Sequence, residues 1–342
     1  MVTLKDLAAV VGVSSSAVSL VLNDRHHGRI NSATAELIRE TADRLGYVPN
    51  GLARSLRTGR THTIGVLSDG VASVPFAGRM LEGVQTAAWD ADYLAMVIDT
   101  TNRSELMPQS TKSLLQRDIE AVVLAVEYHR VVELPEVPPT IPVVILDGFP
   151  DDPTRADSVV PDESGGAHAA VAHLINAGHR RIAFCNVDDD RFIASRLRRE
   201  GYANALDENG IDSDPALIVA VTDPSTATAF PAMLEMLSRE DHPTAVFCFS
   251  DQIAMATYQA AAELGLRIPE DLSVVGFDDQ RYIADALRPA LTTVRLPHYA
   301  MGEWAARRAV DRITGKAAGP RVSELVPCPL IERASVAPPS HR

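Results

Sequence analysis

The stretch VTLKDLAAVVGVSSSAVSLVLN, residues 2–23, decides the fold of the first part of this 342-residue chain. Apolar residues recur at helical spacing on both sides of Gly12, which predicts two short amphipathic helices joined by a turn. Thr3 and Ser14 stand where the two helices would begin, and both residue types cap helix N-termini well. Such a pair is typical of a helix-turn-helix, which lays its second helix in the major groove of DNA.

A third helix follows a polar, basic loop at residues 24–30. Asn31 can cap this helix, and Gly46 can end it. We expect its apolar residues to complete a small core shared by the three helices. The residues expected to point inward are Leu37, Ile38, Ala42 and Leu45.

The segment YVPNGLARSLR, residues 47–57, places Leu52, Ala53 and Leu56 on one face of a single short helix. A helix of this length is unstable alone, and Gly51 lowers its stability further. We therefore expect it to fold only when a partner supplies contacts.

Charge is distributed unevenly along the chain, whose net charge is -13. Residues 1–61 hold eight basic and five acidic residues, a net of +3. The other 281 residues hold 24 basic and 40 acidic residues, a net of −16. A basic head on an acidic body is typical of a protein whose DNA contact is confined to one end.

From Thr63 onward, short apolar runs alternate with amphipathic segments. This alternation predicts parallel strands in sheets that helices cover on both faces. Eight runs exceed one ordinary doubly wound sheet, so we expect two α/β lobes with a ligand cleft at the carboxyl ends of the strands. The predicted strands are 64–67, 95–98, 121–126, 143–146, 182–185, 217–221, 245–249 and 274–276, and the predicted helices are 79–91, 167–177, 196–209, 229–239 and 252–264.

Motifs for catalysis are missing, since GxSxG, HExxH, GxxxxGK[ST] and GxGxxG do not occur. Cys185, Cys248 and Cys328 are far apart, which predicts neither a disulfide nor a zinc site, and Cys185 and Cys248 are expected to be buried. With no apolar signal core or membrane-spanning stretch, we expect a cytoplasmic protein. An enzyme, an exported solute-binding protein, or a sugar- or nucleoside-binding protein without a DNA role are the weaker alternatives.

With these elements placed, the chain resembles the LacI/GalR family of bacterial transcriptional regulators from residue 3 to about residue 333. The head stretch at 2–23 carries the resemblance first. It continues in GYVPN (46–50), ARSL (53–56), IGV (64–66), GHRRIA (178–183), GFDD (276–279) and LTTV (291–294). The resemblance implies an all-α helix-turn-helix head and a periplasmic-binding-protein-like effector domain of two doubly wound parallel-sheet lobes.

The resemblance also implies a domain division and a function. The expected parts are a head at 1–47, a hinge at 48–61, a first lobe at 62–160 and 293–322, and a second lobe at 161–292 and 323–342. The implied function is a sequence-specific repressor whose affinity for double-stranded operator DNA is set by a small-molecule effector, a sugar or sugar derivative. We expect a homodimer, because no long heptad pattern follows Arg333, and we expect no cofactor or metal.

The family reads bases with its second helix, and the matching positions here are Ser15, Ser16, Ala17 and Leu20. Family members commonly carry Arg at the position of Leu20, and leucine cannot make the bidentate contact that reads guanine. Leu20 either touches an apolar group such as a thymine methyl or packs on the head's own core. The other implied DNA contacts are Thr3, Ser14, Ser19, Asn23, Asn31, Tyr47, Asn50, Ala53, Arg54 and Leu56, of which Leu56 matches the leucine that wedges into the minor groove.

The resemblance places six residues around the effector pocket: Phe76, Asp147, Asp162, Arg198, Ser250 and Asp278. Arg and Asp side chains can hold sugar hydroxyls through charge-assisted hydrogen bonds. Two alternatives stay open, because Asp162 can cap the helix that follows it and at least one of the basic residues at 196, 198 and 199 is expected at the surface. Ser250 departs from the Asn often found there, which leaves the identity of the effector open.

Overall fold

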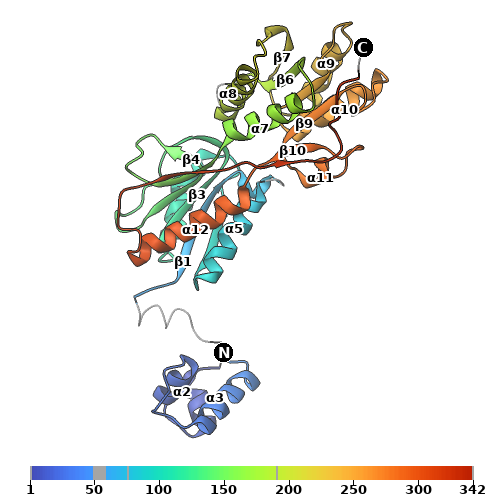
Figure 1. Ribbon diagram of the computed structural model, residues 1–342. Helices are drawn as coiled ribbons and strands as arrows, with labels where there is room; N and C mark the ends of the chain where they lie inside the picture. Colours follow the sequence, from blue (N-terminus) through green and yellow to red (C-terminus); the bar gives the residue numbers. More distant parts are fainter. Residues whose placement is uncertain (1, 49–58, 75–76, 190–191, 341–342) are drawn as a thin grey trace. The chain divides into compact units, whose positions relative to one another are not determined.

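The computed structural model describes residues 2–48, 59–74, 77–189 and 192–340 (Figure 1). The chain divides into two compact units, Met1–Thr61 and His62–Arg342. Five of the residues predicted to contact DNA or effector lie outside the described residues, and they are Asn50, Ala53, Arg54, Leu56 and Phe76.

The first unit is the predicted helix-turn-helix followed by a third helix. Thr3 caps the first helix in a capping box, because its hydroxyl accepts the backbone N–H of Asp6 at 3.3 Å and its own N–H donates to the Asp6 carboxylate at 2.8 Å. Gly12 ends that helix with φ 78°, a conformation that glycine adopts without strain. The helices are α1 (Leu4–Val11), α2 (Ser15–Leu22) and α3 (Ser32–Arg44).

A small apolar core holds these three helices together, and part of the prediction for α3 is wrong. Ile38 and Ala42 are buried as expected, but Leu37 is 48% exposed and Leu45 36%. Leu37 lies about 100° around the helix from Ile38, and Leu45 is the C-cap beyond the last turn. The buried members of the cluster are Leu7, Ala8, Val18, Val21, Ala35, Ile38 and Ala42.

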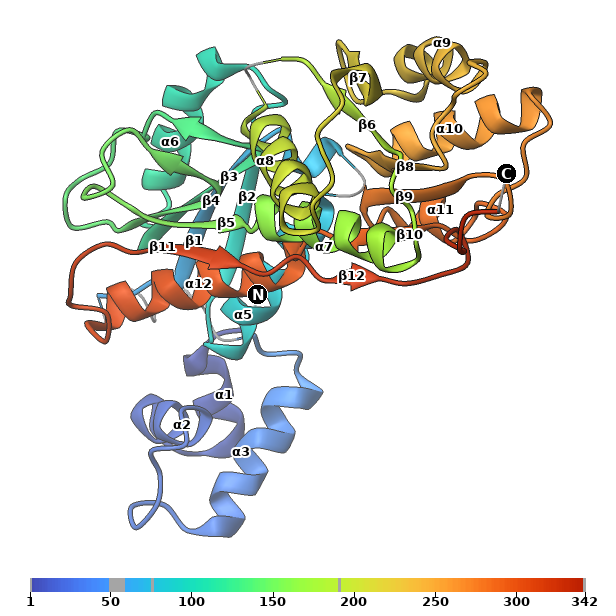
Figure 2. The same ribbon diagram turned by 45° about the horizontal axis from the view of Figure 1, so that its top comes forward.

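The second unit contains two sheets of six strands in the described residues, which confirms the two α/β lobes (Figure 2). The first sheet is wholly parallel, and its order is β11-β5-β4-β3-β1-β2. The second is parallel except for β12, and its order is β12-β10-β9-β8-β6-β7.

The strands of the first sheet are β1 (Thr63–Asp69), β2 (Leu94–Asp99), β3 (Ala121–Val132), β4 (Val143–Pro150), β5 (Asp157–Pro161) and β11 (Ser323–Val326). Those of the second sheet are β6 (Ile182–Val187), β7 (Ile218–Val221), β8 (Ala245–Cys248), β9 (Ser273–Asp278), β10 (Thr292–Arg295) and β12 (Leu330–Ile331). The remaining helices are α5 (Gly78–Asp90), α6 (Met107–Leu115), α7 (Glu163–Asn176), α8 (Ile193–Glu208), α9 (Thr226–Leu237), α10 (Asp251–Glu263), α11 (Arg281–Ala284) and α12 (His298–Thr314). Three short 3-10 turns lie at Val71–Ser73, Ser104–Leu106 and Pro215–Leu217.

The chain crosses between the lobes at three places, and two of the predicted boundaries need correction. The first crossing lies at the end of β5, and the sequence predicted a boundary at residue 160. The sequence assigned residues 293–322 to the first lobe, but β10 belongs to the second sheet. It assigned 323–342 to the second lobe, but β11 pairs with β5 in the first sheet. Both strands are only four residues long, so the apolar pattern gave no sign of the sheet that each would join.

Helices α5 and α12 pack on one face of the first sheet, and α6 covers the other. Glycines let α5 and α12 approach closely. A Cβ atom on Gly83 would lie 2.1 Å from the carbonyl oxygen of Tyr299, and one on Gly302 would lie 2.1 Å from that of Met80. Helices α6, α11 and α12 were not among the helices predicted from the sequence.

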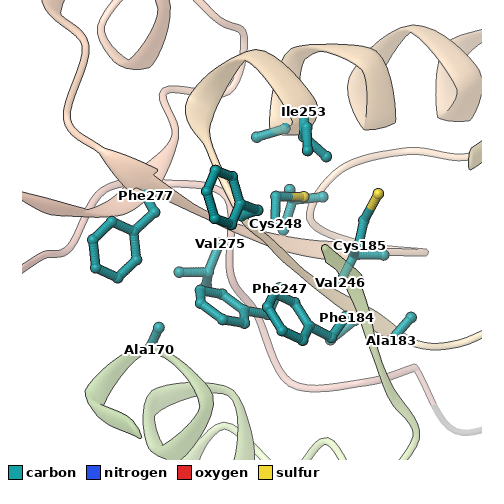
Figure 3. Close-up of a cluster of buried hydrophobic side chains, with 14 of the residues drawn as sticks. Ala170, Ala183, Phe184, Cys185, Val246, Phe247, Cys248, Ile253, Val275 and Phe277 are labelled. Atoms are coloured by element: carbon teal, nitrogen blue, oxygen red, sulfur yellow. The ribbon is translucent and has the colours of Figure 1, made fainter. Parts of the chain in front are cut away.

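A row of aromatic rings runs through the core of the second lobe (Figure 3). Phe184 stacks on Tyr202 at 5.3 Å and on Phe247 at 4.8 Å between ring centroids, and Phe247 lies 6.4 Å from Phe277. Cys185 and Cys248 are buried beside these rings, as predicted, and both are free thiols. The row ends at Phe277, whose ring lies 3.7 Å from the guanidinium carbon of Arg198.

No single helix among the described residues is long and apolar enough to cross a membrane. Only α1 and α2 taken together, which are bent by 105°, reach that length and composition.

Asp157 links segments of the first lobe that are far apart in the sequence. Its fully buried carboxylate faces three arginines. Arg312, Arg308 and Arg321 approach its oxygens at 2.7, 2.9 and 3.3 Å, and the backbone N–H of Val322 donates at 3.0 Å. Burial acts to raise the pKa of Asp157, but the arginine hydrogen bonds outweigh it and lower that pKa to about 2. The carboxylate therefore stabilises the packing of α12, β5 and the start of β11.

Replacing Asp157 by Asn should destabilise the second unit by about 3 kcal/mol, since it leaves the arginines without their carboxylate. Urea denaturation at neutral pH measures this, with Asp151→Asn in an exposed turn as the control. The folded pKa is depressed, so the stabilisation is present above the ordinary value of 3.8 and is lost as the pH falls towards 2. Equal stability of Asp157→Asn and the natural chain at neutral pH would contradict this role.

Candidate functional site

Helix α2 presents a face of small side chains that its own core does not use. Ser16 is exposed, and Ser15, Ala17, Ser19 and Leu20 are half-buried. Leu20 is absent from the apolar side chains that pack against the head core, which are Val2, Leu4, Val11, Val13, Leu22, Ile30 and Tyr47. The face therefore offers hydroxyls and one leucine to a partner, whereas Tyr47 is engaged by the head itself.

Three of the predicted DNA contacts are the N-caps of the three head helices. The Ser14 hydroxyl accepts the N–H of Ala17 at 3.1 Å, and the Asn31 side chain accepts that of Thr34 at 2.7 Å. Thr3 caps α1 in the same way. Backbone N–H groups at a helix N-terminus attract phosphate, so these positions suit contacts that hold the DNA backbone.

Asn23, also a predicted DNA contact, closes α2 at its other end. Its amide donates to the carbonyl of Ser19 at 2.6 Å. The side chain is exposed, so the amide oxygen remains available on the surface of the head.

A pocket between the two lobes of the second unit gathers four of the six residues predicted to hold the effector, namely Asp147, Arg198, Ser250 and Asp278. Asp162 does not line it; its carboxylate accepts the N–H of Gly165 at 2.9 Å and caps α7. The described lining residues are Glu127, Tyr128, His129 and Asp147 of the first lobe, Glu163, Phe192, Ala194, Arg198, Pro224, Phe249, Ser250, Gln252, Asp278 and Gln280 of the second, and Leu296 and His298 at a crossing.

Arg198 of α8 is fully enclosed at the base of this pocket. Its Nε donates to Glu163 at 2.7 Å, its Nη1 donates to the carbonyl of Phe249, and its Nη2 lies 3.6 Å from Asp278. The guanidinium also lies over two rings, 3.7 Å from the centroid of Phe277 and 4.3 Å from that of Phe249. The neighbouring Arg196 and Arg199 are exposed, as expected for at least one of these three arginines.

Asp278 ends β9 with a strained backbone, since its φ is 106°. Burial is the main cause that raises its pKa to about 7, and the charge of Arg198 opposes that rise. Gln280 donates to the carboxylate from its side-chain amide at 2.9 Å. The Asp278 side chain therefore enters the pocket lining with a carboxyl group that changes its charge near neutral pH.

Asp147 projects from an irregularity between β3 and β4. Leu146 pairs with Ala125 and Gly148 pairs with Arg130, so residues 126–129 of β3 bulge opposite Asp147, whose φ is 68°. The side chain is 4% exposed, and its Oδ1 has no hydrogen-bond partner among the described residues. Burial raises its pKa well above the ordinary value, and the charge of Glu163 raises it further.

His129 lies in the same bulge and is 6% exposed. Neither of its ring nitrogens has a hydrogen-bond partner in the described part of the chain. Burial lowers the pKa of His129, which favours the neutral ring with one donor and one acceptor.

Sequence reasoning missed Glu163 and His129. Glu163 could have been found, because a buried arginine needs a carboxylate and Glu163 is the first residue of a helix, directly after its N-cap Asp162. His129 gave no signal, because the predicted strand ended at residue 126 and the bulge carries the chain on from there.

Replacing Asp147 by Asn should stabilise the second unit by about 1 kcal/mol at mildly alkaline pH, because an unpartnered buried carboxylate becomes a neutral amide. A raised folded pKa means that the natural chain loses stability as the pH rises through that pKa. The difference should therefore shrink towards the ordinary value of 3.8, where Asp147 is protonated. Thermal melts over a pH series test this against Asp207→Asn, an exposed change on α8, and a destabilised Asp147→Asn at alkaline pH would refute it.

Two family models match the chain: "Bacterial regulatory proteins, lacI family" over residues 3–50 and "Periplasmic binding protein-like domain" over residues 171–336. The ribose operon repressor of Escherichia coli strain K12 is 33% identical over 98% of this chain and 100% of its own length. The transcriptional repressor PurR of Vibrio atlanticus is 31% identical over 98% of this chain and 99% of its own. A solved complex of the transcriptional regulator CelR with cellobiose is 29% identical, covers 98% of this chain and 100% of that one, and has a TM-score of 0.67.

Proposed function

Because the chain belongs to the lacI family of bacterial regulatory proteins, we propose that it is a repressor whose affinity for operator DNA is set by a small molecule held between its two lobes. The observation that supports the binding of a small molecule between the lobes is the enclosed Arg198, which two carboxylates and two rings hold at the base of the pocket. The described lining residues offer hydrogen-bonding groups and apolar walls for a ligand, and the related proteins are repressors, so we propose regulation as the function.

We propose a carbohydrate or carbohydrate derivative as the effector. The related proteins include a repressor named for the ribose operon and a transcriptional regulator bound to cellobiose. The carboxyl groups of Asp147 and Asp278 and the ring nitrogens of His129 can hold hydroxyl groups, while Phe192 supplies an apolar wall.

For the head, we propose that α2 enters the major groove. Ser14, Ser19, Asn23, Asn31 and Thr3 would position it through the phosphate backbone, and Ser15, Ser16, Ala17 and Leu20 would face the bases. Short side chains make few bidentate contacts, so part of the sequence preference would come from the deformability of the operator. The predicted contacts of Asn50, Ala53, Arg54 and Leu56 belong to the same proposal.

We further propose that two copies act together on a palindromic operator, as two-fold symmetric binding requires. Apolar side chains exposed at the end of α5 and on the edge strand β2 suit such a contact: Trp89 is 75% exposed, Leu94 55% and Val97 44%. The cytoplasm, where the DNA lies, is the proposed location.

Replacing Leu20 by Ala should weaken operator binding about three- to tenfold, because the variant loses an apolar contact in the groove. Titration of the full chain against an operator selected from random DNA measures the change. Leu37→Ala removes a leucine that is exposed on α3 and should leave the affinity unaltered. If Leu20→Ala binds as tightly as the natural chain, Leu20 is not part of the interface.

Replacing Arg198 by Lys should reduce effector binding by more than about tenfold, because lysine cannot reach both carboxylates and the Phe249 carbonyl in the same plane. Operator binding without effector should persist, so the variant would repress without responding. Calorimetry with candidate sugars and operator titration report the two properties separately, and Arg199→Lys on the exposed side of α8 is the control. An intact response in Arg198→Lys would exclude Arg198 from effector recognition.

A further inference from the structure

The charges around the effector pocket are unbalanced. Four carboxyl groups line it, those of Glu127, Asp147, Glu163 and Asp278, whereas Arg198 is the one arginine or lysine among the described lining residues. All five side chains are at most 9% exposed, and this burial strengthens the interactions between their charges.

Arg198 is not free to meet an anion. Its Nε and Nη2 face Glu163 and Asp278, its Nη1 donates to a backbone carbonyl, and the rings of Phe277 and Phe249 lie 3.7 and 4.3 Å from the guanidinium carbon. A phosphate or carboxylate in the pocket would therefore meet several carboxyl groups and no uncommitted cation of the described lining. Anionic ligands are disfavoured by this arrangement.

Asp147 and His129 are the uncommitted groups. The β3 bulge places both on one side of the pocket, and both are more than nine-tenths buried. The Asp147 Oδ1 and both His129 nitrogens lack a hydrogen-bond partner among the described residues. Buried polar atoms without partners lower stability, so a ligand that completes their hydrogen bonds gains affinity.

A hydroxyl group can donate its one proton to Asp147 and accept the N–H of the neutral His129 ring, but it brings no charge to a pocket rich in carboxyl groups. An ammonium group carries three N–H donors and a positive charge, so it can donate to the carboxylate and to the imidazole acceptor together. It also offsets the excess of carboxyl groups around the pocket.

We propose that the effector is a small polyhydroxylated amine, of which a 2-amino sugar is the simplest form, and that its ammonium group lies against Asp147 and His129. The proposal rests on the proposed function, because it takes this pocket to be the effector site. It narrows the ligand from carbohydrates in general to carbohydrates that carry a protonated amine.

Calorimetry on the full chain with matched ligand pairs tests the proposal. The pairs are glucose and glucosamine, galactose and galactosamine, and mannose and mannosamine, each with the N-acetylated amino sugar and the 6-phosphate of the parent. In at least one pair the amine should bind about tenfold or more tightly than the parent sugar, its N-acetyl form should lose that advantage, and the phosphate should not bind.

The variant Asp147→Asn should bring the amine-to-parent affinity ratio close to one, whereas Asp207→Asn should keep the ratio of the natural chain. The N-acetyl comparison tests the same charge without a mutation. An amine that binds no better than its parent, or a preference that survives Asp147→Asn, overturns the proposal.

Operator titration with the same ligands separates the two levels of the argument. If neutral sugars weaken or strengthen the affinity for operator DNA as much as amines do, the proposed function stands and the amine proposal falls. If no sugar, neutral or amine, changes operator affinity, control of this repressor by carbohydrates falls, and the amine proposal falls with it.

Discussion

The enclosure of a single guanidinium in the pocket between the lobes is the constraint on which the arrangement of the second lobe depends. A charged group can be buried only when partners satisfy it, and Arg198 takes its partners from several distant segments. Glu163 comes from the start of α7, Phe249 from the end of β8, and Asp278 from the end of β9. The carboxyl ends of two neighbouring strands and one helix start must therefore converge on α8.

The aromatic row of the second lobe supports Arg198 and makes the base of the pocket rigid. Tyr202 and Arg198 lie on the same helix, one turn apart, and the rings of Phe184, Phe247 and Phe277 connect the core around Tyr202 to the underside of the guanidinium. A change of volume in this row would move Arg198, because close-packed interiors transmit small displacements. The base of the pocket is thus part of the hydrophobic core, whereas the groups contributed by the first lobe are not held in this way.

The sequence allowed the head, the two lobes and four pocket residues to be predicted, and the reasons differ. Thr3, Ser14 and Asn31 were predictable because a helix cap is decided within three residues. Asp147 and Asp278 came only from the family resemblance, since nothing in the local pattern distinguishes them from other acids after a strand. The sheets joined by β10 and β11 could not be predicted, because long-range pairing decides the partner of a four-residue strand.

Backbone strain and unsatisfied polar atoms occur together at the pocket between the two lobes. Asp147 and Asp278 both have positive φ, and the bulge at His129 leaves polar atoms unpaired. A chain selected for stability alone would remove these features, so their presence together at one pocket indicates selection for binding. A ligand that satisfies groups from both lobes at once stabilises their closed arrangement over the open one, and that difference in affinity is the free energy available to change operator binding. In the regulation proposed for this repressor, the stability lost at the unpartnered Asp147 carboxylate would be recovered when the ligand binds, and it would contribute to that free energy.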